Sequence, residues 1–86
     1  MTHDSHPALI KRLKRAHGHL AAVIAMIEAQ RPCADIAQQL FAVESAVTNA
    51  KRELIHDHLE YCLTDGPDGQ ASTATLAEFK DLAKYL

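Results

Sequence analysis

The sequence contains little glycine, proline or aromatic residue: three Gly, three Pro, two Tyr, two Phe and no Trp among 86 residues. Alanine and leucine are abundant instead. This composition favours helix over sheet, and neither an internal repeat nor a strand-like alternation of apolar and polar residues is visible. We therefore expect an all-α fold, and a chain of this length suits one domain with a modest core.

Long apolar runs are also missing, since none approaches the roughly 20 residues that a membrane-spanning helix needs. The start of the chain, residues 1–6, lacks the charged and apolar segments of a signal peptide. We expect a cytoplasmic protein with no membrane partner, whose two cysteines stay reduced. No Ser/His/Asp arrangement, pair of acids or phosphate-binding glycine loop is visible, so we expect neither an enzyme nor a small-molecule substrate.

Helix signals and breaks divide the chain into three predicted helices. Proline suits the first turn of a helix and disfavours helix in the residue before it, so Pro7 and Pro32 bound the first helix. The run Asp-Gly-Pro-Asp-Gly at 65–69 breaks the chain after the second. Thr75 and Glu78 have the spacing of a capping box at the start of the third, although Ser72 or Thr73 could cap it instead. The expected spans are about 7–30, 33–64 and 73–86, within one domain of residues 1–86.

Apolar residues in the two long helices recur in alternating steps of four and three, the period of a helix that buries one stripe. Two long helices and a short one cannot close a four-helix bundle alone, whereas two copies can do so by packing their hairpins together. We therefore expect an antiparallel hairpin dimer that forms a four-helix bundle. The stripe residues are Leu9, Leu13, Ala16, Leu20, Val23 and Ile27, followed by Ile36, Leu40, Val43, Val47, Ala50 and Leu54.

Two cysteines and a histidine form a candidate metal site. His58 and Cys62 are four residues apart and share one helix face. Cys33 begins the same helix, roughly 37 Å from His58 at a rise of ~1.5 Å per residue. One chain cannot join them, but antiparallel pairing places the start of one helix beside the end of another. We therefore expect Cys33 of one chain to meet His58 and Cys62 of its partner, with His3 and His6 as additional candidate ligands.

The donor set narrows the choice of metal. Two sulfurs and one imidazole in trigonal geometry suit Cu(I), which we place first; a nitrogen from His3 or His6 would give a near-planar site for Ni(II), which we place second. Zn(II) could occupy the site tetrahedrally. Taken singly, Cys33 could be an ordinary buried cysteine and the two tail histidines could be solvated, so the prediction depends on the three residues together.

Basic residues gather on the first two helices, and the formal net charge of −2 leaves room for such a patch. In a dimer they could merge into a surface that contacts phosphates, although a solvated helix face is the alternative. No helix-turn-helix or zinc-finger motif is visible, so DNA would have to meet helical surfaces of an oligomer. The cations are Lys11, Arg12, Lys14 and Arg15, then Lys51 and Arg52.

The same segments resemble the CsoR/RcnR/FrmR family of bacterial repressors, which sense copper, nickel or cobalt, and formaldehyde. The likeness covers nearly the whole chain. It implies a tetramer built as a dimer of hairpin dimers, which binds operator DNA without its effector and releases it on binding. The segments that carry it are 12–20 (RLKRAHGHL), Cys33, 38–40 (QQL), 42–43 (AV) and 58–62 (HLEYC). The implied ligands are Cys33, His58 and Cys62, and the implied DNA contacts are Arg12, Arg15 and Lys51, with Lys14 and Arg52 as further candidates.

Three departures from the family pattern bear on the effector. The family usually has Gly-Gln where this chain has Gly18-His19, and the histidine resembles a branch associated with nickel resistance. The copper branch often has tyrosine where Pro32 stands. The formaldehyde branch needs an N-terminal proline and lacks the second cysteine, so Cys62 and the start Met1-Thr2 disfavour formaldehyde.

The expected function is a repressor that binds operator DNA when metal-free and releases it when Cu(I) or Ni(II) binds. Two alternatives remain open. One is a module for metal storage or delivery that never binds DNA. The other is a thiol-based redox or persulfide sensor, in which Cys33 and Cys62 of facing chains react and His58 is dispensable.

Overall fold

The computed structural model describes the backbone of residues 6–64 and 73–86 and the side chains of residues 6–59 and 76–86. Within these ranges the chain is helical and contains no strand, which confirms the predicted all-α fold. Its helices are α1 (His6–Glu28), α2 (Cys33–Thr64) and α3 (Thr73–Ala83). The predicted break at 65–69 lies outside the described residues.

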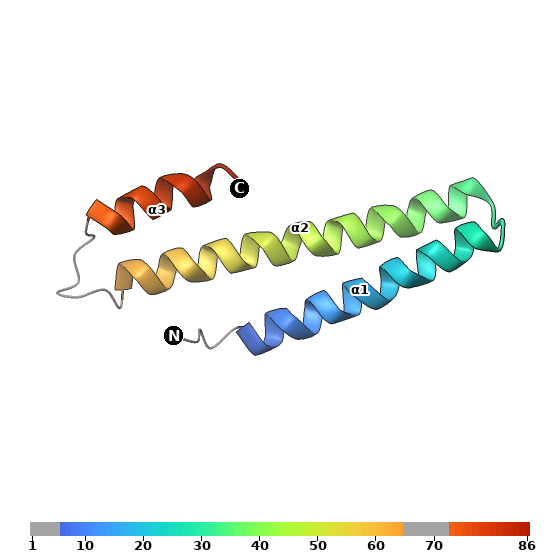
Figure 1. Cartoon of the computed structure of the whole chain (residues 1–86), viewed down its shortest axis with the longest axis horizontal. Coiled ribbons are helices and arrows are strands. Elements are labelled where there is room, and N and C mark those ends of the chain that lie inside the picture. The colour runs from blue at the N-terminus through green and yellow to red at the C-terminus, as the bar shows by residue number, and fades with distance from the viewer. Residues whose placement is uncertain (1–5, 65–72) are drawn as a thin grey trace.

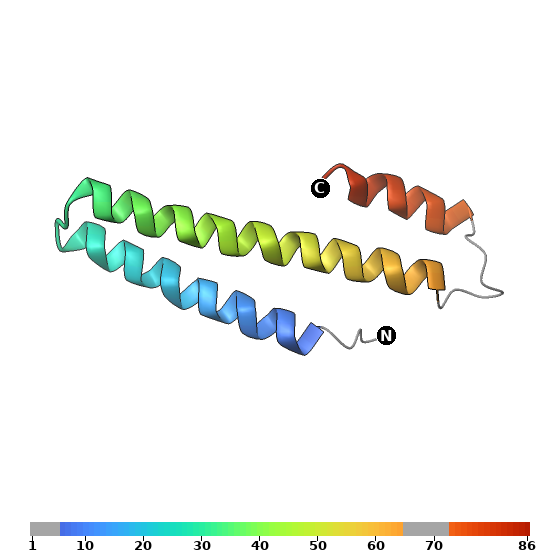
Figure 2. The same ribbon diagram turned by 180° about the vertical axis from the view of Figure 1, so that it is seen from behind.

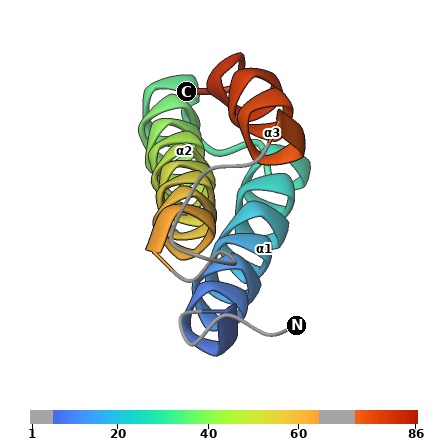
Figure 3. The ribbon, with the colours of Figure 1, turned by 90° about the vertical axis from the view of Figure 1, so that its left-hand side faces the viewer.

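The two long helices form an antiparallel hairpin, and α3 folds back beside the second half of α2 (Figures 1 and 2). Viewed from one end, α3 and α1 lie against different sides of α2 (Figure 3). The hairpin turn closes one end of the molecule, and the start of α1 and the end of α2 lie together at the other. This second end is called the open end below.

A main-chain motif ends α1. Gln30 adopts a left-handed backbone with φ of 57°, and the amides of Gln30 and Arg31 donate to the carbonyls of Ile27 (3.0 Å) and Met26 (3.0 Å). These two bonds are the pattern of a Schellman cap, which satisfies carbonyls that a helix end leaves exposed. α1 therefore ends at Glu28, two residues before the end predicted from Pro32.

Pro32 then starts α2, because its carbonyl accepts hydrogen bonds from the amides of Asp35 (3.0 Å) and Ile36 (3.1 Å). Cys33 is thus the first residue of the helix. At the other end of the chain, the predicted third helix is three residues shorter than expected. Beyond its last residue, Ala83, the amides of Tyr85 and Leu86 donate to the carbonyls of Leu82 and Ala83, three residues back instead of four, the tighter geometry common at helix ends.

The predicted apolar stripe is divided in the structure. Five of its twelve residues form the hairpin seam between α1 and α2, which we define as the buried residues Leu9, Ala16 and Val23 on α1 with Val43 and Ala50 on α2. Ile36 is partly exposed, and the other six stay exposed within the chain, each side chain at 42–54%. This exposed stripe consists of Leu13, Leu20 and Ile27 on α1 with Leu40, Val47 and Leu54 on α2.

The chain is extended, with principal axes of 57, 24 and 13 Å and a radius of gyration of 17.5 Å. A compact domain of this length has a radius of gyration of about 12 Å. The hairpin is therefore a thin slab, and one of its broad faces carries the exposed stripe. No helix among residues 6–64 and 73–86 combines the length and hydropathy of a membrane span.

Candidate functional site

The predicted metal ligands lie at opposite ends of α2. This helix is unbroken from Cys33 to Thr64, so a straight rise of ~1.5 Å per residue separates Cys33 from His58 by roughly 37 Å. Cys33 is a free cysteine and its side chain is exposed beside the hairpin turn. The structure of one chain thus does not bring Cys33 and His58 together.

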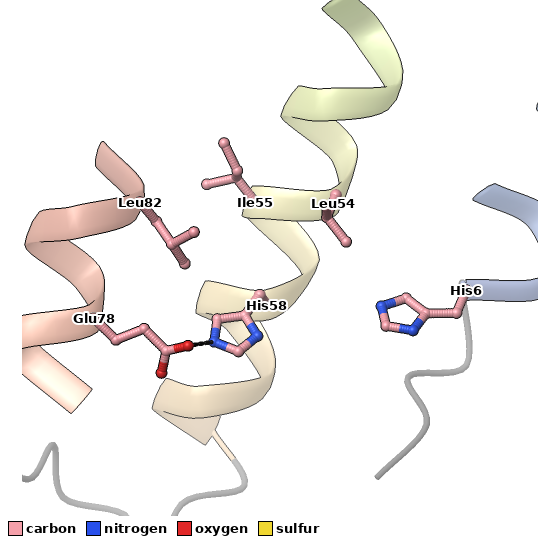
Figure 4. Close-up of a pocket in the computed structure, with 6 residues that line it drawn as sticks. All are labelled: His6, Leu54, Ile55, His58, Glu78 and Leu82. Carbon is pink, nitrogen blue, oxygen red and sulfur yellow. Dashed lines mark ion pairs between the residues drawn. The ribbon is translucent and has the colours of Figure 1, made fainter. Parts of the chain in front are cut away.

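His58 lies at the open end and is partly covered, with 29% of its side chain exposed. Its Nε2 is 2.9 Å from Oε1 of Glu78, which comes from α3 (Figure 4). Histidines that bind metals commonly hydrogen-bond a carboxylate through their second ring nitrogen, which fixes the orientation of the ring. Glu78 therefore contacts the imidazole of His58 in the way that carboxylates contact metal-binding histidines.

A hollow of about 160 Å³ lies at this end and is lined by residues of α1, α2 and α3. His6, the first residue of α1, lines it on the side facing His58, and its ring is directed toward α2 (Figure 4). Apolar side chains of Leu54, Ile55 and Leu82 complete the lining. The structure thus brings His6 into the neighbourhood of His58, whereas His3 lies outside the described residues.

Cys62 falls in α2 one turn beyond His58, but its side chain lies outside the described residues. Among those that are described, no three His, Cys, Asp or Glu side chains are grouped closely enough to hold a metal ion. A site with the predicted donors therefore requires Cys62, a second chain, or both.

The candidate DNA contacts are all exposed: Arg12, Lys14, Arg15, Lys51 and Arg52. Arg12 reaches across the hairpin and forms an ion pair with Glu53 of α2. One and two turns further along α1, Arg15 and His19 lie on the same side of the seam. The Nε2–H of His19 donates to Oε1 of Gln39 at 2.7 Å.

These residues border a second hollow, of about 410 Å³, on the surface of the hairpin. We call it the arginine hollow, because two of its lining residues are arginines. Its α1 side consists of Arg12, Arg15, Ala16 and His19, and its α2 side of Ala46 and Asn49. The hollow therefore combines cationic and amide donors with a floor of small side chains.

Sequence reasoning did not find Glu78, Glu53 or Gln39. Each pairs with a residue at least 20 positions away, and no local pattern marks such a pair. The spacing of Thr75 and Glu78 instead indicated a capping box, but α3 begins at Thr73, so Thr75 lies inside the helix. A search for acidic residues on the helix predicted to follow His58 could have selected Glu78 as a candidate partner.

Comparison with known proteins places these features in context. Residues 5–85 match the profile of a family described as "Metal-sensitive transcriptional repressor". The chain is 37% identical over 82 residues to the copper-sensing transcriptional repressor CsoR of Mycobacterium ulcerans, covering 95% of this chain and 70% of the relative. It is 33% identical over 78 residues to CsoR of Mycobacterium tuberculosis H37Rv (91% and 66%). It is 35% identical over 80 residues to CsoR of Bacillus subtilis 168 (88% and 79%). The chain thus spans about two thirds of the length of these mycobacterial relatives.

Proposed function

Because the chain belongs to the metal-sensitive transcriptional repressor family, we propose that it represses transcription by binding operator DNA in the metal-free state and releases the DNA when Cu(I) binds. The three relatives are named copper-sensing repressors, which supports Cu(I) ahead of Ni(II) and Zn(II). The sensing site we propose is Cys33 of one chain with His58 and Cys62 of its partner.

One observation carries this assignment: α2 is a single unbroken helix whose first residue is Cys33 and whose last turns hold His58 and Cys62. A second α2 that runs antiparallel alongside brings an exposed cysteine to each histidine. The exposed stripe supports such a pairing, because six aliphatic side chains at 42–54% exposure form an apolar face that water covers in the single chain. Two symmetry-related sites per dimer follow.

The residues present fit a soft metal ion. Thiolate sulfur and imidazole nitrogen are donors that Cu(I) favours, and bound Cu(I) would supply a cross-link between α2 of one chain and α2 of the next. The chain's own residues prepare this link. Glu78 pairs with Nε2 of His58, which leaves Nδ1 of the ring as the nitrogen available to bind the metal. The hydrogen-bonded turn before Cys33 fixes where α2 begins.

The direct test measures DNA binding with and without metal. Metal-free protein would select a duplex from a random-sequence library, and its affinity would then be followed during anaerobic titration with Cu(I) or Ni(II). We expect Cu(I) to weaken binding by about 5- to 150-fold, the usual size of an allosteric coupling of ~1–3 kcal/mol. Unchanged affinity with both metals would refute the regulatory function, and a response to Ni(II) alone would reassign the metal.

Two variants separate the alternative functions. Charge reversal of Arg12 and Arg15 to glutamate is expected to abolish DNA binding and leave Cu(I) affinity nearly intact, whereas a storage module would show no DNA binding to lose. His58→Ala is expected to abolish the copper response. If His58→Ala still releases DNA after persulfide treatment, and non-reducing gels show chains linked through Cys33, the protein is a thiol sensor instead.

A further inference from the structure

Two exposed charged residues of α2, Glu44 and Lys51, are not ligands of the proposed metal site, yet they lie between its ligands along the helix. We propose that Glu44 of each chain forms an ion pair with Lys51 of its partner, and that these two pairs set the register in which two antiparallel α2 helices associate. The inference rests on the proposed function, because it concerns how the second chain is seated. It gives Lys51 a role between chains.

Both residues lie on the same side of α2 as the proposed ligands. The helix is unbroken along the molecule (Figure 1). Because successive residues are turned by about 100°, Lys51 has the same angular position as Cys33. The other three residues, Glu44, His58 and Cys62, fall within about 20° of that position. We call this row of five residues the ligand line.

The spacing along the ligand line is symmetric. Glu44 comes 11 residues after Cys33, and Lys51 comes 11 residues before Cys62. An antiparallel partner whose Cys62 lies opposite Cys33 therefore has its Lys51 opposite Glu44, and two-fold symmetry forms the same pair a second time. Packed helices lie about 8–10 Å apart, a gap that the side chains of lysine and glutamate together can bridge.

The exposed stripe independently indicates the same register. Its three residues on α2 are spaced by seven, so an antiparallel pair centred on Val47 packs Leu40 of each chain against Leu54 of the other. Val47 also lies within half a residue of the midpoint between Cys33 and Cys62. The metal ligands, the aliphatic side chains and the charges thus agree on one register to within one residue.

Neither Glu44 nor Lys51 has an opposite charge beside it on its own helix. Side chains three and four positions away are the neighbours on a helix, and around both residues all of these are uncharged. The ion pairs among the described side chains involve neither residue. A partner chain would therefore supply the counter-charge that each needs when an apolar interface covers it. The uncharged neighbours are Leu40, Phe41, Val47, Thr48, Leu54 and Ile55.

The two charges also distinguish between orientations of the partner. A parallel partner in register would place Glu44 beside Glu44 and Lys51 beside Lys51. Like charges placed together across an interface suppress that arrangement. The charge pattern therefore favours the antiparallel pair, which is the arrangement that brings Cys33 to His58.

The test reverses one charge at a time in the full, metal-free chain. Glu44→Lys leaves lysine opposite lysine in a dimer of identical chains, and Lys51→Glu leaves glutamate opposite glutamate. A mixed dimer of the two variants again has opposite charges at both positions. Exchanging both residues within one chain, Glu44→Lys with Lys51→Glu, also restores the pairs and keeps the net charge. The matched control, Arg52→Glu, makes the same charge change one residue further on, about 100° away from the ligand line.

We expect each single reversal to weaken association by about tenfold to a hundredfold, because two attractions become two repulsions. Sedimentation velocity over a range of concentrations measures this. The exchanged variant and Arg52→Glu should associate like the wild type. When the two single variants are refolded together, one of them labelled with nitrogen-15, native mass spectrometry should find mixed dimers well above the half that random pairing gives.

The mixture keeps the inference falsifiable even if a single reversal fails to fold alone, because mixing restores association only where the two charges face each other. Single reversals that associate like the wild type, or mixed dimers at the random half, would overturn the inference. If wild-type chains meanwhile release DNA with Cu(I), the proposed function still stands. Wild-type chains that remain single at every concentration would refute the proposed inter-chain site first, and the inference with it.

Discussion

At the turn end of α2, Cys33 follows a main-chain motif closed by hydrogen bonds of 3.0 Å, and its side chain is exposed. At the open end, His58 is 29% exposed, is bonded to Glu78 at 2.9 Å, and borders a hollow that His6 also lines. The first end presents a donor at the surface of the molecule. The second end holds a donor within a prepared, partly apolar recess.

The contrast between the two ends explains how one helix could contribute to a proposed site that it cannot complete alone. A cysteine on a rigid, exposed corner can enter a recess of another chain, whereas a histidine fixed by a carboxylate cannot reach outward. In the dimer that we propose, each end would supply what the other lacks, because antiparallel pairing would join unlike ends twice.

Complementation between chains gives the largest effect. Cys33→Ala and His58→Ala should each abolish copper-dependent release of DNA, because each removes one ligand from both sites. Chains of the two variants, unfolded and refolded together, should regain about a quarter of the wild-type copper sites, since half of the dimers are mixed and each carries one intact site. Copper bound per chain after removal of weakly held metal is the measurement. No recovery on mixing would show that the ligands come from one chain.

A charge within the exposed stripe should prevent two chains from pairing and so prevent both proposed metal sites from forming. Val47 belongs to the exposed stripe, and Val47→Asp would place a charge where we propose that two chains meet. We expect association to weaken by at least about a hundredfold, because an unpaired carboxylate is costly to bury. Sedimentation velocity measures the assembly. Ala42→Asp, on the opposite broad face, is the control, and equal assembly of the two variants would contradict the proposed interface.

Metal affinity should depend on Glu78 less strongly than on the proposed ligands themselves. Glu78→Gln keeps the shape of the side chain but removes the carboxylate at Nε2 of His58, and loss of such a partner typically costs about 10- to 100-fold in metal affinity. Competition with a copper chelator measures this affinity. Asp81→Asn, which alters an exposed acid on the same helix that pairs with Lys84 at 3.5 Å, should leave it unchanged. An equal loss in both variants would point to the general charge of α3.

The smallest effect concerns the rigid turn. Gln30 has a positive φ, which glycine adopts without the steric cost borne by other residues. Gln30→Gly should raise the free energy of unfolding by about 0.5 to 1 kcal/mol. The same change inside α2, Gln38→Gly, should lower it by a similar amount, about 0.5 to 1 kcal/mol. Urea denaturation at one fixed protein concentration measures both, and a loss of stability in Gln30→Gly would contradict the cap.

The sequence predicted the helices and the separation of Cys33 from His58, because periodicity and helical rise are local properties. It did not show how the stripe divides. Val23 follows a step of three and Leu20 a step of four in the predicted stripe, and Val23 is fully buried whereas Leu20 is 42% exposed. The two places alternate along the stripe, but both are equally apolar. Hydropathy records that a side chain prefers burial and not which chain buries it, so burial within a hairpin and burial between hairpins leave the same pattern.

The pairs of the site escaped prediction for a related reason. The bond between His58 and Glu78 depends on how α3 returns along α2, and the bond between Arg12 and Glu53 depends on the register of the hairpin. The residues near either partner specify neither the return of α3 along α2 nor the register of the hairpin. Charged residues on amphipathic helices have many neighbours within reach, so the structure was needed to select among them.

The slab measures only 13 Å along its shortest axis, which is close to the diameter of one helix, about 10–12 Å. A solitary chain therefore buries few side chains, and in the dimer that we propose folding would depend on protein concentration. Among the side chains described, six hydrophobic ones are buried. We expect the folded fraction to rise with total protein concentration, as it does for obligate dimers, so that the amount of chain present would also set its stability.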